Sequence, residues 1–436
     1  MNLILLTTVV MLFFIAFIVC DKDFFAPAVI VTLVFSICCY IALYANKTLD
    51  LNINKKTYSI LVLGLGTIVA VNVLVKFFFM LQRKSTYKYL KSQIIEFRIY
   101  NKYFFVTLSA VVFVISIIAM LRLALSIGGS GLSSIIYLYR MNSLSGDQHL
   151  PSIVSNLITI NYALGYCWIY VCINNFYVSR KIDKSMILMI IFPVLTGILS
   201  GSRGDVIHYI IFAIVLYYFY YLISKNKKTI DMKLVRKILI VFILLFLFFY
   251  LSKFVIGRQD ELGYFEYICG HLAHPLKLLD KFVNDTPASK SYWGEETFTN
   301  MIATILKYSK SGEVLRYNTY ASFVYINGIS YGNVYTAFRA YYSDFGTLGV
   351  IVVPGCISLV SSVVYYGFRT RIFNSKRIFN WYIFIYSYLV YGLFMMFYSN
   401  QILEYIVNIS FFKNIIVWIV FYTFCLRGVK LKIGEN

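Results

Sequence analysis

The sequence is poor in charge, and acidic residues are the scarcest. Only 14% of its 436 residues are charged, with 19 Asp and Glu against 40 Lys and Arg, whereas 60% are hydrophobic. The mean hydropathy is +0.74. A chain this apolar cannot cover itself with a water-compatible surface, so a soluble globular fold is excluded. The Lys and Arg residues fall in short clusters and form no single basic domain, so we expect no nucleic-acid partner.

Motifs for metal or redox chemistry are also lacking. Six of the eight cysteines lie in or beside apolar runs without metal-ligand or redox spacing, namely Cys20, Cys38, Cys39, Cys167, Cys172 and Cys356. His271 and His274 are three residues apart, but no third ligand accompanies them. We therefore expect neither a metal nor a cofactor. The sequence also contains no internal repeat and no low-complexity tract, which favours one membrane domain over residues 1–436.

Apolar runs of about 20 residues recur along the chain, long enough to cross a bilayer as helices, which satisfy their own backbone polar groups. The sequence therefore predicts an all-α polytopic membrane protein with about 11 (10–12) transmembrane helices. The expected spans are 2–20, 24–45, 58–82, 103–126, 153–178, 185–200, 205–223, 235–253, 344–367, 380–399 and 405–426.

Basic clusters follow alternate spans, and the positive-inside rule makes them cytoplasmic together with the C-terminus. The clusters begin at Arg83, Arg180, Lys225, Arg369 and Arg427. The segments between them, 128–151, 200–205, 256–331 and 399–404, are then extracytoplasmic. Lys47, Lys55 and Lys56 break the pattern, because the alternation places them outside.

Residues 256–331 are predicted to form one large extracytoplasmic loop within the membrane domain. The alternative is a disordered insertion, but the aromatic and apolar content of 302–306 and 323–326 favours an ordered structure. A long segment among short ones often carries function.

The turn 200–205 places Arg203 between two spans, where a charge is costly and usually partnered. Ser202 and Asp205 have the spacing of a capping box, which would direct free backbone N–H groups toward an anion held by Arg203. The alternative is that Ser202 and Asp205 only cap the helix and that Arg203 extends toward water.

A second polar group enters a span at the same predicted face, within residues 331–346. In a helix, Tyr335, Arg339 and Tyr342 would share one side, and Asp344 is too far along to pair with Arg339 within that helix. The alternative is an interfacial aromatic belt with one arginine reaching to water.

Further polar candidates lie in the predicted outside segments. Several arginines converging on one pocket would suit an anionic lipid diphosphate, because a guanidinium stays charged and presents paired donors. A histidine or carboxylate would be a general base, although His271 and His274 can equally be packing residues. These candidates include Arg140, Arg258, His274, Glu296 and Arg316.

The Gly-Ser-Arg-Gly turn at 201–204 and the Gly-Asn-Val-Tyr-Thr…Asp-Phe-Gly stretch at 332–346 resemble the Wzy-type oligosaccharide repeat unit polymerases. The plan of many spans with one large extracytoplasmic loop in the C-terminal half is similar too, and resembles that of GT-C-like polymerases and ligases. The resemblance covers most of the chain as layout, but only these two motifs as residues.

The resemblance implies polymerisation of undecaprenyl-diphosphate-linked oligosaccharides into O-antigen, capsule or exopolysaccharide at the outer face of the bacterial cytoplasmic membrane. The catalytic residues would be Arg203 and Arg339, which stabilise the leaving diphosphate, with His274, Glu296 or Asp344 as base. Flippase and chain-length regulator proteins are possible partners. An O-antigen ligase-like transferase and a lipid-linked oligosaccharide flippase remain as alternatives. The residues expected to bind substrate are Arg140, Arg258, Glu296, Arg316, Tyr335 and Tyr342.

Overall fold

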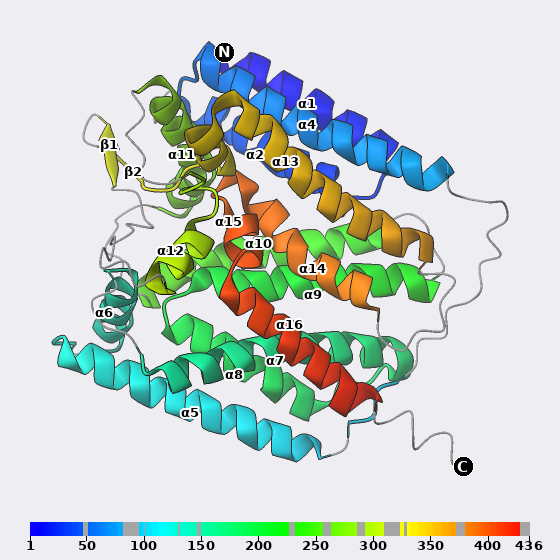
Figure 1. Ribbon diagram of the computed structural model, residues 1–436, viewed down its shortest axis with the longest axis vertical. Helices are drawn as coiled ribbons and strands as arrows, with labels where there is room; N and C mark the ends of the chain where they lie inside the picture. Colours follow the sequence, from blue (N-terminus) through cyan, green and yellow to red (C-terminus); the bar gives the residue numbers. More distant parts are fainter. Residues whose placement is uncertain are drawn as a thin grey trace. The chain divides into compact units, whose positions relative to one another are not determined.

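The computed structural model (Figure 1) describes residues 1–46, 51–81, 96–99, 101–129, 131–145, 150–225, 232–255, 263–285, 293–308, 323–326, 329–371 and 380–427. These residues are almost entirely helical. The chain divides into two compact units. Unit 1 comprises 1–90, 262–374 and 388–409, and unit 2 comprises 91–261, 375–387 and 410–436.

Unit 1 contains long helices together with shorter elements from the predicted loop. Its elements are α1 (Asn2–Val19), α2 (Pro27–Tyr44), α4 (Lys55–Leu81), α11 (Tyr264–Asn284), α12 (Thr299–Tyr308), β1 (Val324–Ile326), β2 (Ile329–Gly332), α13 (Ala337–Arg371), η1 (Met395–Phe397) and α15 (Gln401–Ile406). The helix α14 (Trp381–Phe394) contributes to both units.

Unit 2 holds the remaining helices around an aromatic core. They are α5 (Lys102–Ser126), α6 (Leu132–Ser145), α7 (Ser152–Ser179), α8 (Lys184–Leu199), α9 (Arg203–Lys225), α10 (Met232–Val255), α16 (Ile409–Phe421) and η2 (Tyr422–Arg427). In the core, the Tyr166 ring packs against Tyr209 and Phe212, with centroids 4.4 and 5.0 Å away. Offset and edge-on ring contacts of this kind add to the stabilisation from burial.

The multi-pass helical prediction is confirmed. Among the described residues, nine helices are long and apolar enough to cross a membrane, and each coincides with a predicted span. The predicted spans 185–200 and 380–399 fall on two shorter apolar helices, Lys184–Leu199 and Trp381–Phe397. A count of about eleven spans stays a prediction.

The segment predicted as one large loop has regular structure where it is described. It contains the helices α11 and α12 and the antiparallel pair β1–β2. One face of α11 is buried, including Leu272, Leu276 and Leu279, whereas Phe265 is exposed. Such an amphipathic helix is typical of a surface-lying element and differs from a membrane span. The expectation of order in this segment is therefore confirmed for its described parts.

The helices α4 and α13 pack closely along each other in unit 1. Gly64 makes this possible, because a Cβ atom at that position would lie only 2.2 Å from the Phe338 ring. Further along, the Ser358 hydroxyl donates to the Ile68 carbonyl at 2.8 Å, and the Asn72 amide donates to Ser362 at 2.7 Å. Small and hydroxyl side chains are common where membrane helices approach closely.

One end of this helix pair carries two ion pairs, of which only the pair at Asp23 is buried. Asp23 is almost fully buried and accepts hydrogen bonds from the Tyr365 hydroxyl and the Phe25 N–H, while the Arg369 guanidinium lies 3.2 Å away. Lys76 pairs with Asp21 at 2.8 Å. Asp21 and Asp23 have the Asp-x-Asp spacing of some metal sites, but each carboxylate pairs with a basic side chain of the protein.

At the opposite end of α4, the buried Asp280 joins α11 to the start of the helix. Its Oδ1 accepts the Asn54 N–H and the Thr57 hydroxyl, both at 2.7 Å, and its backbone carbonyl accepts the Asn284 amide. A carboxylate at a helix N-terminus satisfies amides that have no partner within the helix. This contact places α11 beside the beginnings of α4 and α13 (Figure 1).

Candidate functional site

Arg339, in the first turn of α13, is held by two aromatic rings and a carboxylate. Its guanidinium carbon lies 4.1 Å from the Tyr335 ring centroid and 4.9 Å from that of Phe282. Its Nε lies 3.4 Å from Glu296 Oε2, a distance of ion pairing, but makes no hydrogen bond. Burial raises the pKa of the Tyr335 phenol, so the ring stays neutral beside the cation. Tyr335 and Arg339 of the predicted shelf therefore lie together, although Tyr335 precedes the first residue of α13, Ala337. The second ring at Arg339 is Phe282 of α11, which the sequence did not predict.

Glu296 is fixed by a turn that precedes α12. Its Oε1 accepts a hydrogen bond from the Ser343 hydroxyl at 2.8 Å. Asp344 accepts the backbone N–H groups of Glu296 and Thr297, at 3.3 and 2.6 Å. Asp344 thus caps this turn and positions Glu296, which is a structural role distinct from the predicted role as base. Its assignment as base stays a prediction that these bonds do not favour.

Lys56 is a further cation beside this group that was not among the predicted site residues. It is near the start of α4, where its Nζ donates to the Val283 carbonyl at 2.9 Å and lies 5.6 Å from the Tyr342 ring centroid. The feature of the sequence that could have indicated Lys56 is that it breaks the predicted positive-inside alternation. Lys56, on a segment predicted to be outside, lies next to α11 and α13 in unit 1.

His274 lies on α11 and is neutral near neutral pH. Desolvation lowers its pKa to about 4, against the effect of a hydrogen bond with the Tyr331 backbone. Its ring packs 4.7 Å from the Tyr331 ring, and its Nε2 is buried without a hydrogen-bond partner. His271 Nδ1 lies 2.9 Å from the Tyr267 carbonyl oxygen. A buried ring nitrogen does not reach a substrate, so this geometry favours a packing role for His274.

Glu404 is a second unpredicted titratable residue of unit 1. Desolvation raises the pKa of its carboxyl to about 7. The Gln401 side chain donates to its Oε2 at 3.0 Å, and its backbone carbonyl accepts the Asn300 amide from α12 at 2.9 Å. Sequence reasoning missed it because a single Glu at the edge of an apolar run carries no motif.

The other predicted arginines with described positions belong to unit 2. Arg203 donates to the Phe249 carbonyl at 3.2 Å, with its guanidinium carbon 4.2 Å from the Phe249 ring centroid. Gly201 has a φ of +70°, and a Cβ atom there would lie 3.1 Å from the Arg140 side chain. Arg140 therefore contacts the predicted turn. Because Arg203 is in unit 2 and Arg339 in unit 1, their convergence on one ligand stays a prediction.

Two predicted substrate-binding residues, Arg258 and Arg316, lie outside the described residues. Tyr342 is half-buried and faces Lys56. The described site of unit 1 therefore consists of Lys56, Phe282, Glu296, Tyr335, Arg339, Tyr342 and Ser343, which we call the Arg339 site.

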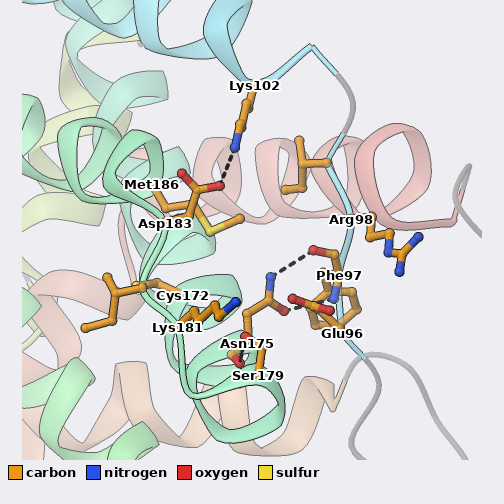
Figure 2. A pocket seen from close by; sticks show the side chains of 12 residues that line it. Glu96, Phe97, Arg98, Lys102, Cys172, Asn175, Ser179, Lys181, Asp183 and Met186 are labelled. Atoms are coloured by element: carbon orange, nitrogen blue, oxygen red, sulfur yellow. Dashed lines mark hydrogen bonds and ion pairs between the residues drawn. The ribbon is translucent and has the colours of Figure 1, made fainter.

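Unit 2 contains a cavity of about 410 Å³ next to the extended segment 96–99 (Figure 2). The Asn175 amide holds this segment through two hydrogen bonds of 2.8 Å with the backbone of Phe97. Lys102 pairs with Asp183 at 2.7 Å, which lowers the pKa of Asp183 although burial alone would raise it. The cavity is lined by residues next to two basic clusters predicted to be cytoplasmic.

Comparisons with known proteins give no further assignment. No model of a protein family, no curated protein and no solved structure matches the chain.

Proposed function

We propose that the chain is a membrane-bound glycosyltransferase that polymerises undecaprenyl-diphosphate-linked oligosaccharide repeat units on the outer face of the bacterial cytoplasmic membrane. The observation that supports this most is the Arg339 site. It joins a guanidinium, an ammonium and a carboxylate at one end of a bundle of apolar helices. The motif 332–346, on which the resemblance partly rests, includes Arg339 and Ser343.

Arg339 and Lys56 are suited to bind the diphosphate of the donor. No hydrogen bond joins the Arg339 side chain to another described residue, so its terminal N–H groups are available to a ligand. The rings of Tyr335 and Phe282 hold the guanidinium in place before substrate arrives. Charge that grows on the leaving phosphate oxygen would then be stabilised without reorganisation of the site.

Glu296 is the best placed of the three predicted bases. It would take the proton of the attacking sugar hydroxyl as the new C–O bond forms at the anomeric carbon. The bond from that carbon to the phosphate oxygen breaks, and the lipid diphosphate leaves with the electron pair. Ser343 and Arg339 orient the two oxygens of the carboxylate, so its geometry is fixed in advance. Asp344 and His274 are engaged in capping and packing instead.

A transferase needs a base, whereas a flippase does not. The carboxylate set between a hydroxyl and a guanidinium therefore favours transfer over translocation. A ligase-like transferase would use the same site with a different acceptor, and the products of the reaction distinguish the two activities.

The test uses purified protein with undecaprenyl-diphosphate-linked repeat units isolated from the producing cells. Wild type is expected to form a ladder of lengthening products. Arg339→Ala should slow the ladder by about 10²–10³-fold, the range for loss of one preorganised transition-state donor. Arg98→Ala is the control, because Arg98 is exposed in unit 2, and it should leave the rate unchanged.

Three results would contradict the proposal. The absence of a ladder with wild type would argue against polymerisation, and transfer only to a lipid acceptor would indicate a ligase. A normal ladder from Arg339→Ala would show that this arginine takes no part in the reaction.

A further inference from the structure

We propose that Trp293 and Phe345 form a binding platform for the saccharide of the repeat unit, next to the Arg339 site. Trp293 is 81% exposed, and its ring packs against Phe345 with centroids 4.8 Å apart. Phe345 contacts one side of the Trp293 indole, and most of the remaining surface of the indole is accessible to a ligand. This inference rests on the proposed function, since it names where the sugar is held.

The platform and the polar groups of the site are built from the same two short segments. Trp293 and Glu296 belong to one turn, and Ser343 and Phe345 belong to the end of one helical segment. Three contacts join these segments: the Trp293–Phe345 ring contact, the Glu296–Ser343 hydrogen bond, and the bonds from Asp344 to the turn. A sugar ring on Trp293 is therefore directed toward the carboxylate of Glu296.

Two glycines fix the positions of the rings. Gly294 has a φ of +76°, and a Cβ atom there would lie 2.9 Å from Phe298 and 3.5 Å from Phe345. Gly346 has a φ of 61° and a ψ of −147°, a combination open almost only to glycine, and it kinks α13 just after Phe345. The orientation of the Trp293–Phe345 pair is thus specified by the backbone on both sides.

The chemistry around the indole fits a saccharide better than lipid. A pyranose has an apolar face that suits an aromatic ring and hydroxyl groups at its rim that suit carboxylates. Glu295 and Glu296 follow Trp293 closely, and charged groups are costly against hydrocarbon. Exposed apolar residues of α13 begin after the kink, at Leu348, which marks the start of the part that suits lipid.

An exposed tryptophan at a membrane surface also serves as an interfacial anchor, and the experiment must separate the two roles. The protein is reconstituted in nanodiscs, and its tryptophan fluorescence is recorded during titration with lipid-free oligosaccharides released from the polysaccharide of the producing cells. A fluorescence change that is lost in Trp293→Phe, but kept in Phe265→Ala, supports the platform. Phe265 is a matched exposed aromatic on α11, 78% accessible and outside the Arg339 site.

A parallel measurement uses nanodiscs made with brominated phosphatidylcholine. The bromine atoms quench the fluorescence of a tryptophan only where it contacts the lipid chains. A quenched component that disappears in Trp293→Phe would place the ring in the bilayer and overturn the proposal. So would an oligosaccharide response that Trp293→Phe retains in full, or the absence of any response in wild type.

Kinetics separate this inference from the proposed function. In the ladder assay, Trp293→Ala should raise the KM for the repeat unit at least about 10-fold, with a smaller change in kcat, because one stacking contact of binding is lost. An unchanged KM would overturn the platform and leave the polymerase proposal intact. No ladder with wild type, together with a Trp293-dependent oligosaccharide response, would instead overturn the polymerase and leave a saccharide-binding site.

Discussion

Arg339 is held chiefly by the faces of aromatic rings. A guanidinium stacked on rings keeps its in-plane donors free, whereas one bound by carboxylates on every side would have none left for a ligand. Lysine cannot reproduce this arrangement, because its ammonium has no plane to stack. We therefore expect Arg339→Lys to restore only a small part of the ladder activity lost in Arg339→Ala, and equal activity of Arg339→Lys and wild type would show that charge alone suffices.

His274 and Glu404, both in unit 1, should change its stability in opposite directions as pH rises. His274 has a pKa lowered from 6.5 to about 4 by desolvation. Its unfolded form binds a proton that its folded form does not, so stability is lost as pH falls from 6.5 toward 4. Glu404 has a pKa raised from 4.5 to about 7 by desolvation. The stability from Glu404 is complete below pH 4.5 and is lost as pH rises through 7.

Between pH 4.5 and 6.5 the stability contributed by His274 rises with pH, whereas that contributed by Glu404 falls. Substitution of one residue should therefore leave the pH dependence of the other visible. We predict that the Tm of His274→Phe in detergent falls as pH rises across this range, whereas the Tm of Glu404→Gln rises. Thermal unfolding at closely spaced pH values measures both. Slopes equal to that of wild type in the two variants would mean that neither group titrates differently on unfolding.

At the scale of single elements, the kink in α13 determines where the site ends. Gly346 combines φ 61° with ψ −147°, and among the described residues no side chain or distant backbone atom lies within 4 Å of the position that a Cβ would take there. The cost of Gly346→Ala is therefore backbone strain without a steric clash, about 1–3 kcal/mol of unfolding free energy. Because straightening the kink would move Phe345 and Ser343, ladder activity should fall as well.

Gly66→Ala is the matched control for this prediction. Gly66 lies in α4, also has open space around its Cβ position, and has an ordinary helical φ. Alanine is the better helix former there, so stability should rise by up to about 1 kcal/mol. Equal effects of the two substitutions on unfolding would contradict the role of backbone conformation at Gly346.

The attachment of α11 depends on one buried carboxylate. Asp280→Ala would leave the Thr57 hydroxyl and the Asn54 N–H without their acceptor. The buried Thr57 hydroxyl alone would cost about 1–3 kcal/mol, whereas water can reach the exposed Asn54. Lys281→Ala changes the next residue of α11, which is exposed, and should stay within about 0.5 kcal/mol of wild type. Protection of α11 amides in hydrogen exchange, compared between the two variants, tests whether the helix is released.

At the scale of the whole molecule, the sequence predicted the elements better than their contacts. Hydrophobic runs are local, so all nine long apolar helices found among the described residues coincide with predicted spans. The pairing of Glu296 with Arg339 joins residues far apart in the chain, and no periodicity indicates it. The same holds for Asp344, whose capping of a distant turn cannot be read from its own neighbours.

Lys56, the exception in the predicted charge pattern, also makes a contact between residues far apart in the chain. This lysine, which breaks the predicted positive-inside alternation, donates a hydrogen bond to the Val283 carbonyl of α11. Topology rules describe insertion into the membrane, and they do not account for a cation retained at a site. A residue that breaks such a rule is therefore a candidate for function when no motif surrounds it.

The orientation of unit 1 in the membrane decides whether the Arg339 site faces the side on which the lipid-linked repeat units are exposed after they are flipped across the bilayer. Along α4, Lys56 and Lys76 are about 30 Å apart, close to the thickness of the hydrocarbon core. We predict that Phe265→Cys, on the helix α11 that also carries Phe282 of the site, reacts with an impermeant maleimide on intact cells. Lys22→Cys, beside the Asp21–Lys76 pair, should react only after the cells are opened. Wild type gives the background from native thiols, and the reverse pattern would put the site in the cytoplasm, where the proposed polymerisation has no substrate.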